Sequence, residues 1–336
     1  MAELLKIEHL SVSLDTPSGV VEAVRDVSLT VNEGEVLALV GESGCGKSML
    51  CKAVMRLLPR NARIVSGSIS VCGEDVTRLP ERRMRALRGR LFSMVFQDPM
   101  TALNPTLPVG DQIAEAVRVH DRSVSRRAAR ERAAALMRRV GIDHPEERSR
   151  MCPYGFSGGM RQRCVMAAAL AGNPRVLFAD EPTTALDVTV QAQILDLFRE
   201  IQREMRTATV FVTHDLGVVA RVADRVAVMY AGRIVEIGTA DEVFYDPRHP
   251  YTWGLLRALP ANAHNGHLTP IPGMPPTLID PPRGDAFAER NDFALGVDYL
   301  EAPPMFPITD THFAATWLLD PRAARVESPL KGERNG

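Results

Sequence analysis

The residues best suited to do chemistry form a glycine-rich segment near the N-terminus. Residues 41–48 read GESGCGKS, which fits the pattern G-x-x-x-x-G-K-[ST]. Glycines at these positions let successive backbone amides point at one phosphate group, and Lys47 can then reach the outer phosphates of a nucleotide as a point charge. The hydroxyl of Ser48 is suited to ligate Mg²⁺. We predict a nucleotide-binding loop here, although kinases, GTPases and transport ATPases all carry such a loop.

The expected nucleotide contacts extend one residue beyond this motif. They are Gly41, Glu42, Ser43, Gly44, Cys45, Gly46, Lys47, Ser48 and Met49. The helix predicted to begin at Lys47 adds the positive end of its dipole to the same anion.

Cys45 occupies a variable position of the motif, with amides and the Lys47 ammonium close by, so we expect the pKa of its thiol to be lowered.

Two acidic residues follow an apolar run later in the chain. Residues 176–182 read VLFADEP. We expect the carboxylate of Asp180 to hold Mg²⁺ through water, and Glu181 to orient or deprotonate an attacking water molecule. The alternative is that Glu181 is a solvated acid at the end of a strand. The presence of the phosphate-binding loop favours the catalytic interpretation.

A third motif, SGGMR at residues 157–161, stands about twenty residues upstream of VLFADEP. With GESGCGKS, SGGMR and VLFADEP following one another along the chain, the sequence resembles the ABC ATPase family. The resemblance implies that Ser157 and the amides of Gly158 and Gly159 lie at a helix N-terminus and bind the γ-phosphate of ATP held on another subunit. An isolated SGG would also fit a turn with a helix N-cap, but its place upstream of VLFADEP favours the functional interpretation.

The same resemblance assigns roles to three more residues. Gln97, in MVFQDP, matches a residue that touches Mg²⁺ and water. His214, in VFVTHD, matches one that contacts the γ-phosphate, although an isolated histidine there would more often be a packing residue. Asp187, in TTALD, matches a residue that crosses the interface between two cassettes. The implied catalytic residues are Glu181, His214, Gln97 and Lys47, and the implied metal ligands are Ser48, Gln97 and Asp180.

The segments around these motifs predict a layered α/β architecture. Short continuous apolar runs, such as residues 174–181 and 207–215, are separated by a helical segment, which is typical of parallel strands buried on both faces. Residues 4–40 contain short β-type runs and turns. Between about 98 and 156 the apolar spacing changes to that of helices. We therefore predict a P-loop (RecA-like) core with an antiparallel β region near the N-terminus and an inserted helical subdomain.

The C-terminal part has a different composition. Proline clusters after about residue 240 exclude long helices and central strands. We predict a nucleotide-binding domain over residues 1–260 and a loop-rich, proline-rich extension over residues 261–336. Residues 248–260 (RHPYTWGLLRALP) and 271–284 (IPGMPPTLIDPPRG) resemble the extension of ATPase subunits that serve oligopeptide, dipeptide and nickel importers.

Many members of that subfamily place four cysteines in this extension for an iron–sulfur cluster. In this chain the comparable positions are Asp285, Asn291, Asp298 and Thr316, so we expect no cluster. The extension should instead be held together by packing of its aromatic residues. These are Phe287, Phe293, Tyr299, Phe306, Phe313 and Trp317.

Composition restricts where the protein works. The 336 residues are 45% hydrophobic, enough for a sizeable core, and 40 Lys and Arg against 41 Asp and Glu give a net charge of -1. This balance gives no bulk attraction to nucleic acid or anionic lipid. The N-terminus lacks the apolar core of a signal peptide, and no apolar run is long enough to span a bilayer. We expect a peripheral protein on the cytoplasmic face of the cell (inner) membrane, attached through protein partners.

Single features of the chain also fit other classes of protein. A run of five arginines at residues 82–90 suggests nucleic-acid binding, but a local run on a neutral protein is usually a solvated face. ABC-type repair ATPases would need a coiled-coil or zinc-bearing insert, and translation factors carry two cassettes, whereas each motif occurs once here. We predict the ATPase subunit of an ABC importer of oligopeptides or dipeptides, with nickel or another small solute as the alternative cargo. Its expected partners are a second ATPase subunit, two transmembrane permease subunits and, indirectly, an extracytoplasmic solute-binding protein.

Overall fold

The computed structural model describes residues 2–184, 186–259 and 270–331. Contacts within the chain define two compact units, each assembled from several stretches of sequence. Unit 1 comprises Met1–Lys6, Thr30–Val36 and Ile69–Val212, and unit 2 comprises Ile7–Leu29, Leu37–Ser68 and Thr213–Gly336. The predicted boundary between residues 260 and 261 lies outside the described residues, so the division into a nucleotide-binding domain and an extension stays a prediction.

The centre of unit 1 is a set of parallel strands in the order β8-β7-β6. Their bounds are β6 (Phe92–Val95), β7 (Val176–Asp180) and β8 (Ala208–Thr213). Every residue of these strands is buried, as the continuous apolar runs predicted. Because β7 is paired on both sides, Asp180 is fixed at the carboxyl end of a central strand, opposite Val212 of β8.

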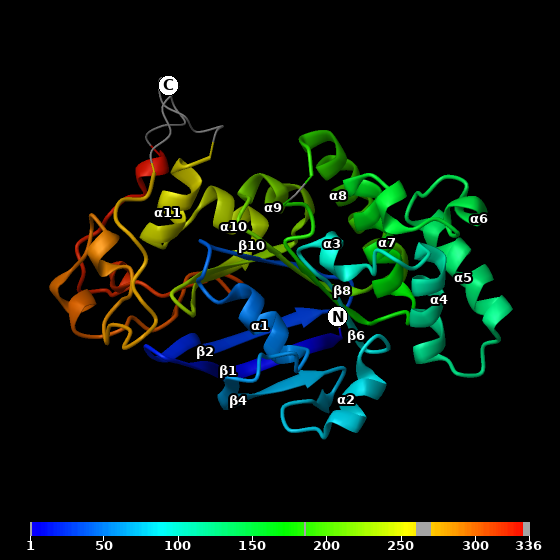
Figure 1. Ribbon diagram of the computed structural model, residues 1–336. Helices are drawn as coiled ribbons and strands as arrows, with labels where there is room; N and C mark the ends of the chain where they lie inside the picture. The colour runs from blue at the N-terminus through cyan, green and yellow to red at the C-terminus, as the bar shows by residue number, and fades with distance from the viewer. Residues whose placement is uncertain (1, 185, 260–269, 332–336) are drawn as a thin grey trace. The chain divides into compact units, whose positions relative to one another are not determined.

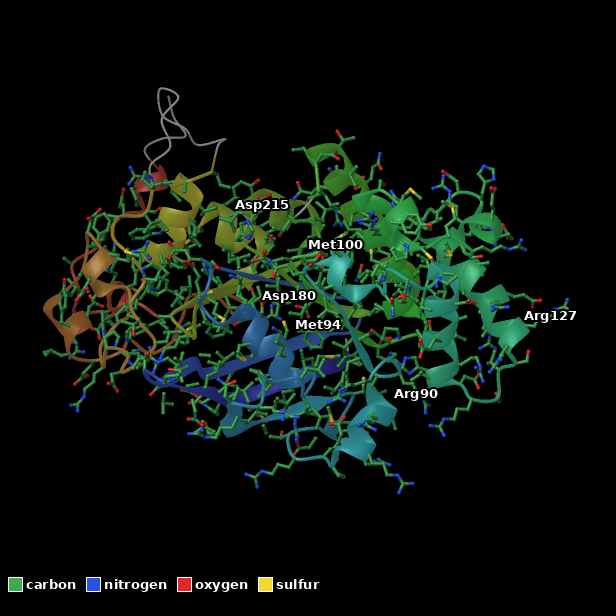
Figure 2. All side chains as sticks on the ribbon, in the orientation of Figure 1. Arg90, Met94, Met100, Arg127, Asp180 and Asp215 are labelled. Atoms are coloured by element: carbon green, nitrogen blue, oxygen red, sulfur yellow. The ribbon has the colours of Figure 1, made fainter. Side chains whose placement is uncertain are left out.

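Unit 1 also contains helices. They are α2 (Glu81–Leu87), α3 (Pro99–Ala102), α4 (Val109–His120), α5 (Arg126–Arg139), α6 (Pro145–Arg148), α7 (Gly158–Leu170) and α8 (Val188–Met205), with the 3₁₀ turn η1 (Pro153–Gly155). Helices α4, α5 and α7 pack side by side through apolar faces (Figure 1). The opposite face of α5 is solvated, and Arg127 points away from the helices (Figure 2). Helices therefore occupy the predicted region between residues 98 and 156.

The strands of unit 2 follow the order β11-β12-β10-β9-β3. They are β3 (Val36–Val40), β9 (Arg225–Tyr230), β10 (Arg233–Thr239), β11 (Phe306–Pro307) and β12 (Phe313–Ala314). Strands β3 and β9 are parallel, whereas β10 is antiparallel to both β9 and β12. The helices of this unit are α1 (Lys47–Val54), α9 (Leu216–Val222), α10 (Ala240–Tyr245) and α11 (Pro250–Arg257).

A second sheet is formed by the N-terminal part of the chain in the order β2-β1-β4-β5. Its strands are β1 (Glu3–Thr16), β2 (Gly19–Asn32), β4 (Ala62–Val71) and β5 (Glu74–Asp75). A two-residue turn joins β1 to β2 as a hairpin, and β4 pairs with β5 antiparallel. The predicted α/β fold with an antiparallel N-terminal β region is therefore confirmed.

The segment after residue 270, orange and red in Figure 1, shares an apolar core with α11. It comprises the strands β11 and β12 and the short 3₁₀ turns η3 (Ala288–Arg290), η4 (Gly296–Tyr299), η5 (Trp317–Leu319) and η6 (Pro329–Lys331). The Phe287 ring centroid lies 5.2 Å from that of Tyr230, and the Phe293 centroid lies 5.5 Å from that of Trp253. Phe306 contacts Trp317 in the same way at 6.0 Å.

The expectation that Tyr299 packs in this core is wrong. Its side chain is 58% exposed. In the turn η4 the residue before it, Asp298, faces the interior and accepts a hydrogen bond from the amide of Leu295 at 2.6 Å. Because Asp298 takes the inward position, the neighbouring ring of Tyr299 is left at the surface.

The four polar residues at the cysteine positions are all buried. Three of them cap turns, since Asp285, Asn291 and Thr316 each accept a hydrogen bond from the backbone amide two residues later, at 3.0, 3.0 and 3.3 Å. Short polar side chains favour such turns because they replace a backbone acceptor locally. Local turn capping thus gives these positions a structural role in this chain.

Burial of Asp285 predicts a pH-dependent stability. Burial, helped by the charge of Asp298, raises the pKa of Asp285 from 3.8 to about 6. As pH rises from 4 to 6, Asp285 ionises in the unfolded chain but keeps its proton in the folded chain. The free energy of unfolding therefore falls over this window, and it stays lower at higher pH. We expect Asp285→Asn, which keeps the acceptor for the Phe287 amide, to raise the free energy of unfolding by about 2 kcal/mol at pH 7.5.

Urea denaturation of both proteins at several pH values would measure this difference. It should shrink as pH falls towards 4. Asp292→Asn, at an exposed neighbouring carboxylate, is the matched control and should give no pH-dependent difference. An Asp285→Asn protein that is no more stable than the natural chain at pH 7.5 would contradict the assignment.

Candidate nucleotide-binding site

The glycine-rich loop joins the end of β3 to the start of α1 in unit 2. Two of its glycines are required by space as well as by conformation. Gly41 has φ 150°, and a Cβ there would lie 2.1 Å from the carbonyl oxygen of Met229. Gly46 has φ 107°, and a Cβ there would lie 2.2 Å from the carbonyl oxygen of Ala23. The loop therefore packs closely against the backbone of β9 and β2, and it leads into the N-terminus of α1, where the first amides of a helix have no partner within the helix.

Lys47 lies inside this loop. Its side chain is only 5% exposed. The Nζ atom donates hydrogen bonds to the carbonyl oxygens of Gly41 at 2.7 Å and Glu42 at 2.9 Å. A buried ammonium needs such partners, and here the loop itself supplies them. The predicted positive charge is thus held at the centre of the loop.

The other side chains of the loop differ in how far they are exposed to solvent. Ser43 and Gly44 are exposed, whereas Glu42, Ser48 and Met49 are half-buried. Cys45 is buried, and this corrects the expectation of a lowered thiol pKa. Burial raises the pKa of Cys45, and attraction to the Lys47 ammonium offsets this only in part. The sequence showed the nearby charge but gave no sign that burial would outweigh it.

Two residues that the sequence did not suggest also contact the loop. The hydroxyl of Tyr251, on α11, accepts a hydrogen bond from the amide of Glu42 at 2.8 Å. Arg290, the last residue of η3, donates two hydrogen bonds to the carboxylate of Glu42. Neither lies near the loop in sequence, so spacing alone gave no signal for them.

In unit 1 the structure brings Gln97 and Glu181 together. The Gln97 Nε2 donates to Glu181 Oε2 at 3.0 Å, and the hydroxyl of Thr184 donates to the same oxygen at 2.9 Å. Glu181 has φ 46°, a left-handed conformation that costs a non-glycine residue about 1–2 kcal/mol. Strain of this kind is concentrated at functional sites, where the surrounding structure enforces it. Asp180, next to it, is 4% exposed at the end of β7 (Figure 2).

Ser157 and Asp187 begin two neighbouring helices of unit 1. Ser157 caps α7 by accepting from the amide of Met160 at 3.4 Å, and Asp187 caps α8 by accepting from the amide of Val190 at 2.9 Å. Both side chains are exposed, as is Gly158. A Cβ on Gly159 would lie 2.4 Å from the Val190 side chain, so this glycine allows α7 and α8 to approach closely.

The predicted residues thus divide between the two units. Those of unit 1 are Gln97, Ser157, Gly158, Gly159, Asp180, Glu181 and Asp187, and those of unit 2 are residues 41–49 and His214. His214 is exposed and directly follows β8. The next residue, Asp215, caps α9 by accepting from the amide of Gly217 at 2.8 Å, which fixes the turn that carries His214.

Comparisons with known proteins show the family of the chain. Residues 24–184 match the family "ABC transporter", and residues 235–296 match "Oligopeptide/dipeptide transporter, C-terminal region". The chain is 53% identical to the oligopeptide transport ATP-binding protein OppD of Bacillus subtilis (strain 168), covering 98% of this chain and 92% of that one. It is 51% identical to the dipeptide transport ATP-binding protein DppD of Lactococcus lactis subsp. cremoris (strain MG1363), with 97% and 94% covered.

A solved structure of the ATP-binding cassette MJ0796, a dimer bound to ADP and Pi, is similar in fold. Its TM-score is 0.63 at 24% identity, over 70% of this chain and 98% of that one. The family match and these relatives together define an ATP-hydrolysing cassette. The chain belongs to the ABC transporter family, among its ATP-binding proteins. Among the described residues, no helix is both long and apolar enough to cross a membrane.

Proposed function

We propose that this chain is the subunit that hydrolyses ATP to power an importer of oligopeptides or dipeptides. The observation that carries the cargo assignment is the match of residues 235–296 to the C-terminal region of oligopeptide/dipeptide transporters. The sequence identities of 53% to OppD and 51% to DppD, over nearly the whole chain, support this assignment. Import of nickel or another small solute is the alternative, because the cargo is chosen by other subunits.

The loop of unit 2 is proposed to bind the phosphates of ATP. At Gly41 and Gly46 a Cβ would collide with the carbonyl oxygens of Met229 and Ala23, so these glycines allow the tight loop conformation that the phosphate-binding motif requires. Lys47 supplies the charge for the β- and γ-phosphates, and the Ser48 hydroxyl is an oxygen ligand of the kind that Mg²⁺ prefers. Asp180 and Gln97 would add a carboxylate and an amide oxygen to the ligand set. Mg²⁺, when bound, would neutralise phosphate charge that develops during hydrolysis.

Glu181 is proposed to act on the attacking water. Its carboxylate is oriented by Gln97 and Thr184, so it is held in one geometry. From that position it would accept a proton of the water as the water oxygen bonds to the γ-phosphorus, while the bond from that phosphorus to the bridging oxygen breaks and ADP leaves. His214 is proposed to contact the γ-phosphate, and Ser157, Gly158, Gly159 and Asp187 to complete the site of a partner cassette. The exposed position of Ser157 and Asp187 supports this last role.

The proposed partners follow from these surfaces. A second ATPase subunit, either a copy of this chain or a paralogue, would supply the opposing cassette. Two permease subunits would cross the membrane and contact the helical region near Gln97, and a solute-binding protein would deliver the cargo to them. The chain would then lie peripherally on the cytoplasmic face of the membrane. The absence of an iron–sulfur cluster stays a prediction.

Deleting the gene in its own organism should test the assignment. We expect uptake of radiolabelled di- and oligopeptides to be lost and to return with the natural chain but not with a Lys47→Ala variant. Nickel accumulation in the same cells is the control and should be unchanged. Normal peptide uptake with lost nickel uptake would instead favour the alternative cargo.

A further inference from the structure

An ion pair in unit 2 joins the segment after residue 270 to the phosphate-binding loop. Two nitrogens of the Arg290 guanidinium donate hydrogen bonds to the two carboxylate oxygens of Glu42, at 2.6 and 2.9 Å. The Arg290 side chain is only 4% exposed. Paired, charge-assisted hydrogen bonds of this geometry are among the strongest and most directional in proteins. The two residues lie 248 positions apart in sequence.

Other contacts hold Arg290 in place. Its Nε donates to the carbonyl oxygen of Pro272 at 2.7 Å, and one terminal nitrogen also donates to the Tyr230 hydroxyl at 3.2 Å. The guanidinium carbon lies 5.7 Å from the Tyr230 ring centroid and 5.8 Å from that of Phe287. The hydrogen bonds to Glu42 raise the pKa of Arg290, so it stays charged. The arginine is therefore a fixed charge, with its position set by the extension's own core.

Glu42 connects this charge to the loop. Its amide donates to the Tyr251 hydroxyl at 2.8 Å, while its carbonyl oxygen accepts from Lys47 Nζ at 2.9 Å. A carboxylate in a loop that binds phosphates would repel them, because like charges in a partly buried site interact strongly. Arg290 cancels that charge. Tyr251, the partner of the Glu42 amide, belongs to the same apolar core as Tyr230 and Phe287, the two rings that contact Arg290.

We propose that Arg290 acts on the nucleotide site through Glu42: the C-terminal segment uses it to neutralise the Glu42 carboxylate and so sets nucleotide affinity. This inference rests on the proposed role of residues 41–48 in binding ATP. It assigns to the C-terminal segment a function in nucleotide binding. It also predicts that the two partners of the ion pair have opposite effects when each is neutralised.

Binding of Mg-ADP to the purified full chain, measured by isothermal titration calorimetry at pH 8, tests the proposal. Arg290→Met leaves the Glu42 charge uncompensated, and we expect Kd to rise about tenfold. Glu42→Gln leaves one net positive charge, so Kd should fall. The double variant removes both charges and should return Kd to within about threefold of the natural chain. A role in folding alone would weaken binding in every one of these variants.

Two controls separate the possible failures. Arg322→Met breaks an exposed pair with Asp320 in the same segment and should leave Kd unchanged. Lys47→Ala in the same assay should lose binding, and unchanged binding there would overturn the proposed role of the loop itself. With Lys47→Ala behaving as expected, an unchanged Kd in Arg290→Met, or equal losses in the single and double variants, would overturn the role of Arg290. If Arg290→Met does not fold, a Kd that does not fall in Glu42→Gln overturns it equally.

Discussion

Replacing Glu181 by glutamine should reduce steady-state ATP hydrolysis by about 10²–10⁴-fold, the range usual for loss of a general base. The amide is nearly identical in shape, and its Oε1 can still accept hydrogen bonds from Gln97 and Thr184, which both point at one oxygen of Glu181. What is lost is the ability to take a proton from water. Folding and ATP binding should therefore persist, and phosphate release measured at saturating Mg-ATP should show the loss in kcat.

The matched control for this variant is Glu204→Gln. Glu204 lies in α8 of the same unit and forms a surface pair with Arg139, so its neutralisation should change kcat by less than twofold. Size-exclusion chromatography should show Glu181→Gln accumulating as a dimer with ATP, because the nucleotide that closes the two cassettes is not consumed. Turnover near that of the natural chain in Glu181→Gln would refute the assignment.

The parts of the site that could be predicted from sequence are those with chemistry that requires fixed local spacing. A loop that wraps a phosphate needs its glycines and lysine within eight positions, and the structure places Gly41, Gly46 and Lys47 as that pattern implies. An apolar run that ends in an acid likewise predicts the carboxyl end of a buried strand, where Asp180 is found. In both places local spacing and the wider fold agree.

Features that depend on long-range packing could not be read in this way. The ion pair between Arg290 and Glu42 spans most of the chain, and although Glu42 lies in the glycine-rich motif, nothing near it in sequence marks Arg290 as its partner. Burial of the Cys45 thiol reversed the expected direction of its pKa shift for the same reason, since desolvation depends on neighbours that arrive from elsewhere. The left-handed backbone of Glu181 is set by its amide hydrogen bond to Val212 on the adjacent strand.

The second large effect on ATP hydrolysis is expected from a change at the surface that would meet a partner cassette. In the proposed mechanism Ser157 completes the site of a partner cassette, and its exposed position at the start of α7 leaves it available to do so. Ser157→Arg should therefore abolish hydrolysis without weakening ATP binding to the isolated chain, because a bulky cation obstructs only the site across the interface. The substitution also removes a helix cap, which costs about 0.5–2 kcal/mol of stability. Steady-state hydrolysis and equilibrium ATP binding, measured on one preparation, separate the two effects.

Ser125→Arg provides the matched control, because Ser125 caps α5 of the same unit in the same way, by accepting from the amide of Ala128 at 3.2 Å. It loses an equivalent cap, yet hydrolysis should stay within about twofold of the natural chain.

We further propose that the isolated chain is mostly monomeric because its physiological partner is a paralogue. Activity per chain should then be low and rise with protein concentration, as mass action requires of a weak dimer. Specific activity that stays high and flat on dilution would contradict the weak dimer, and activity that survives in Ser157→Arg would contradict the role of Ser157 in a partner's site.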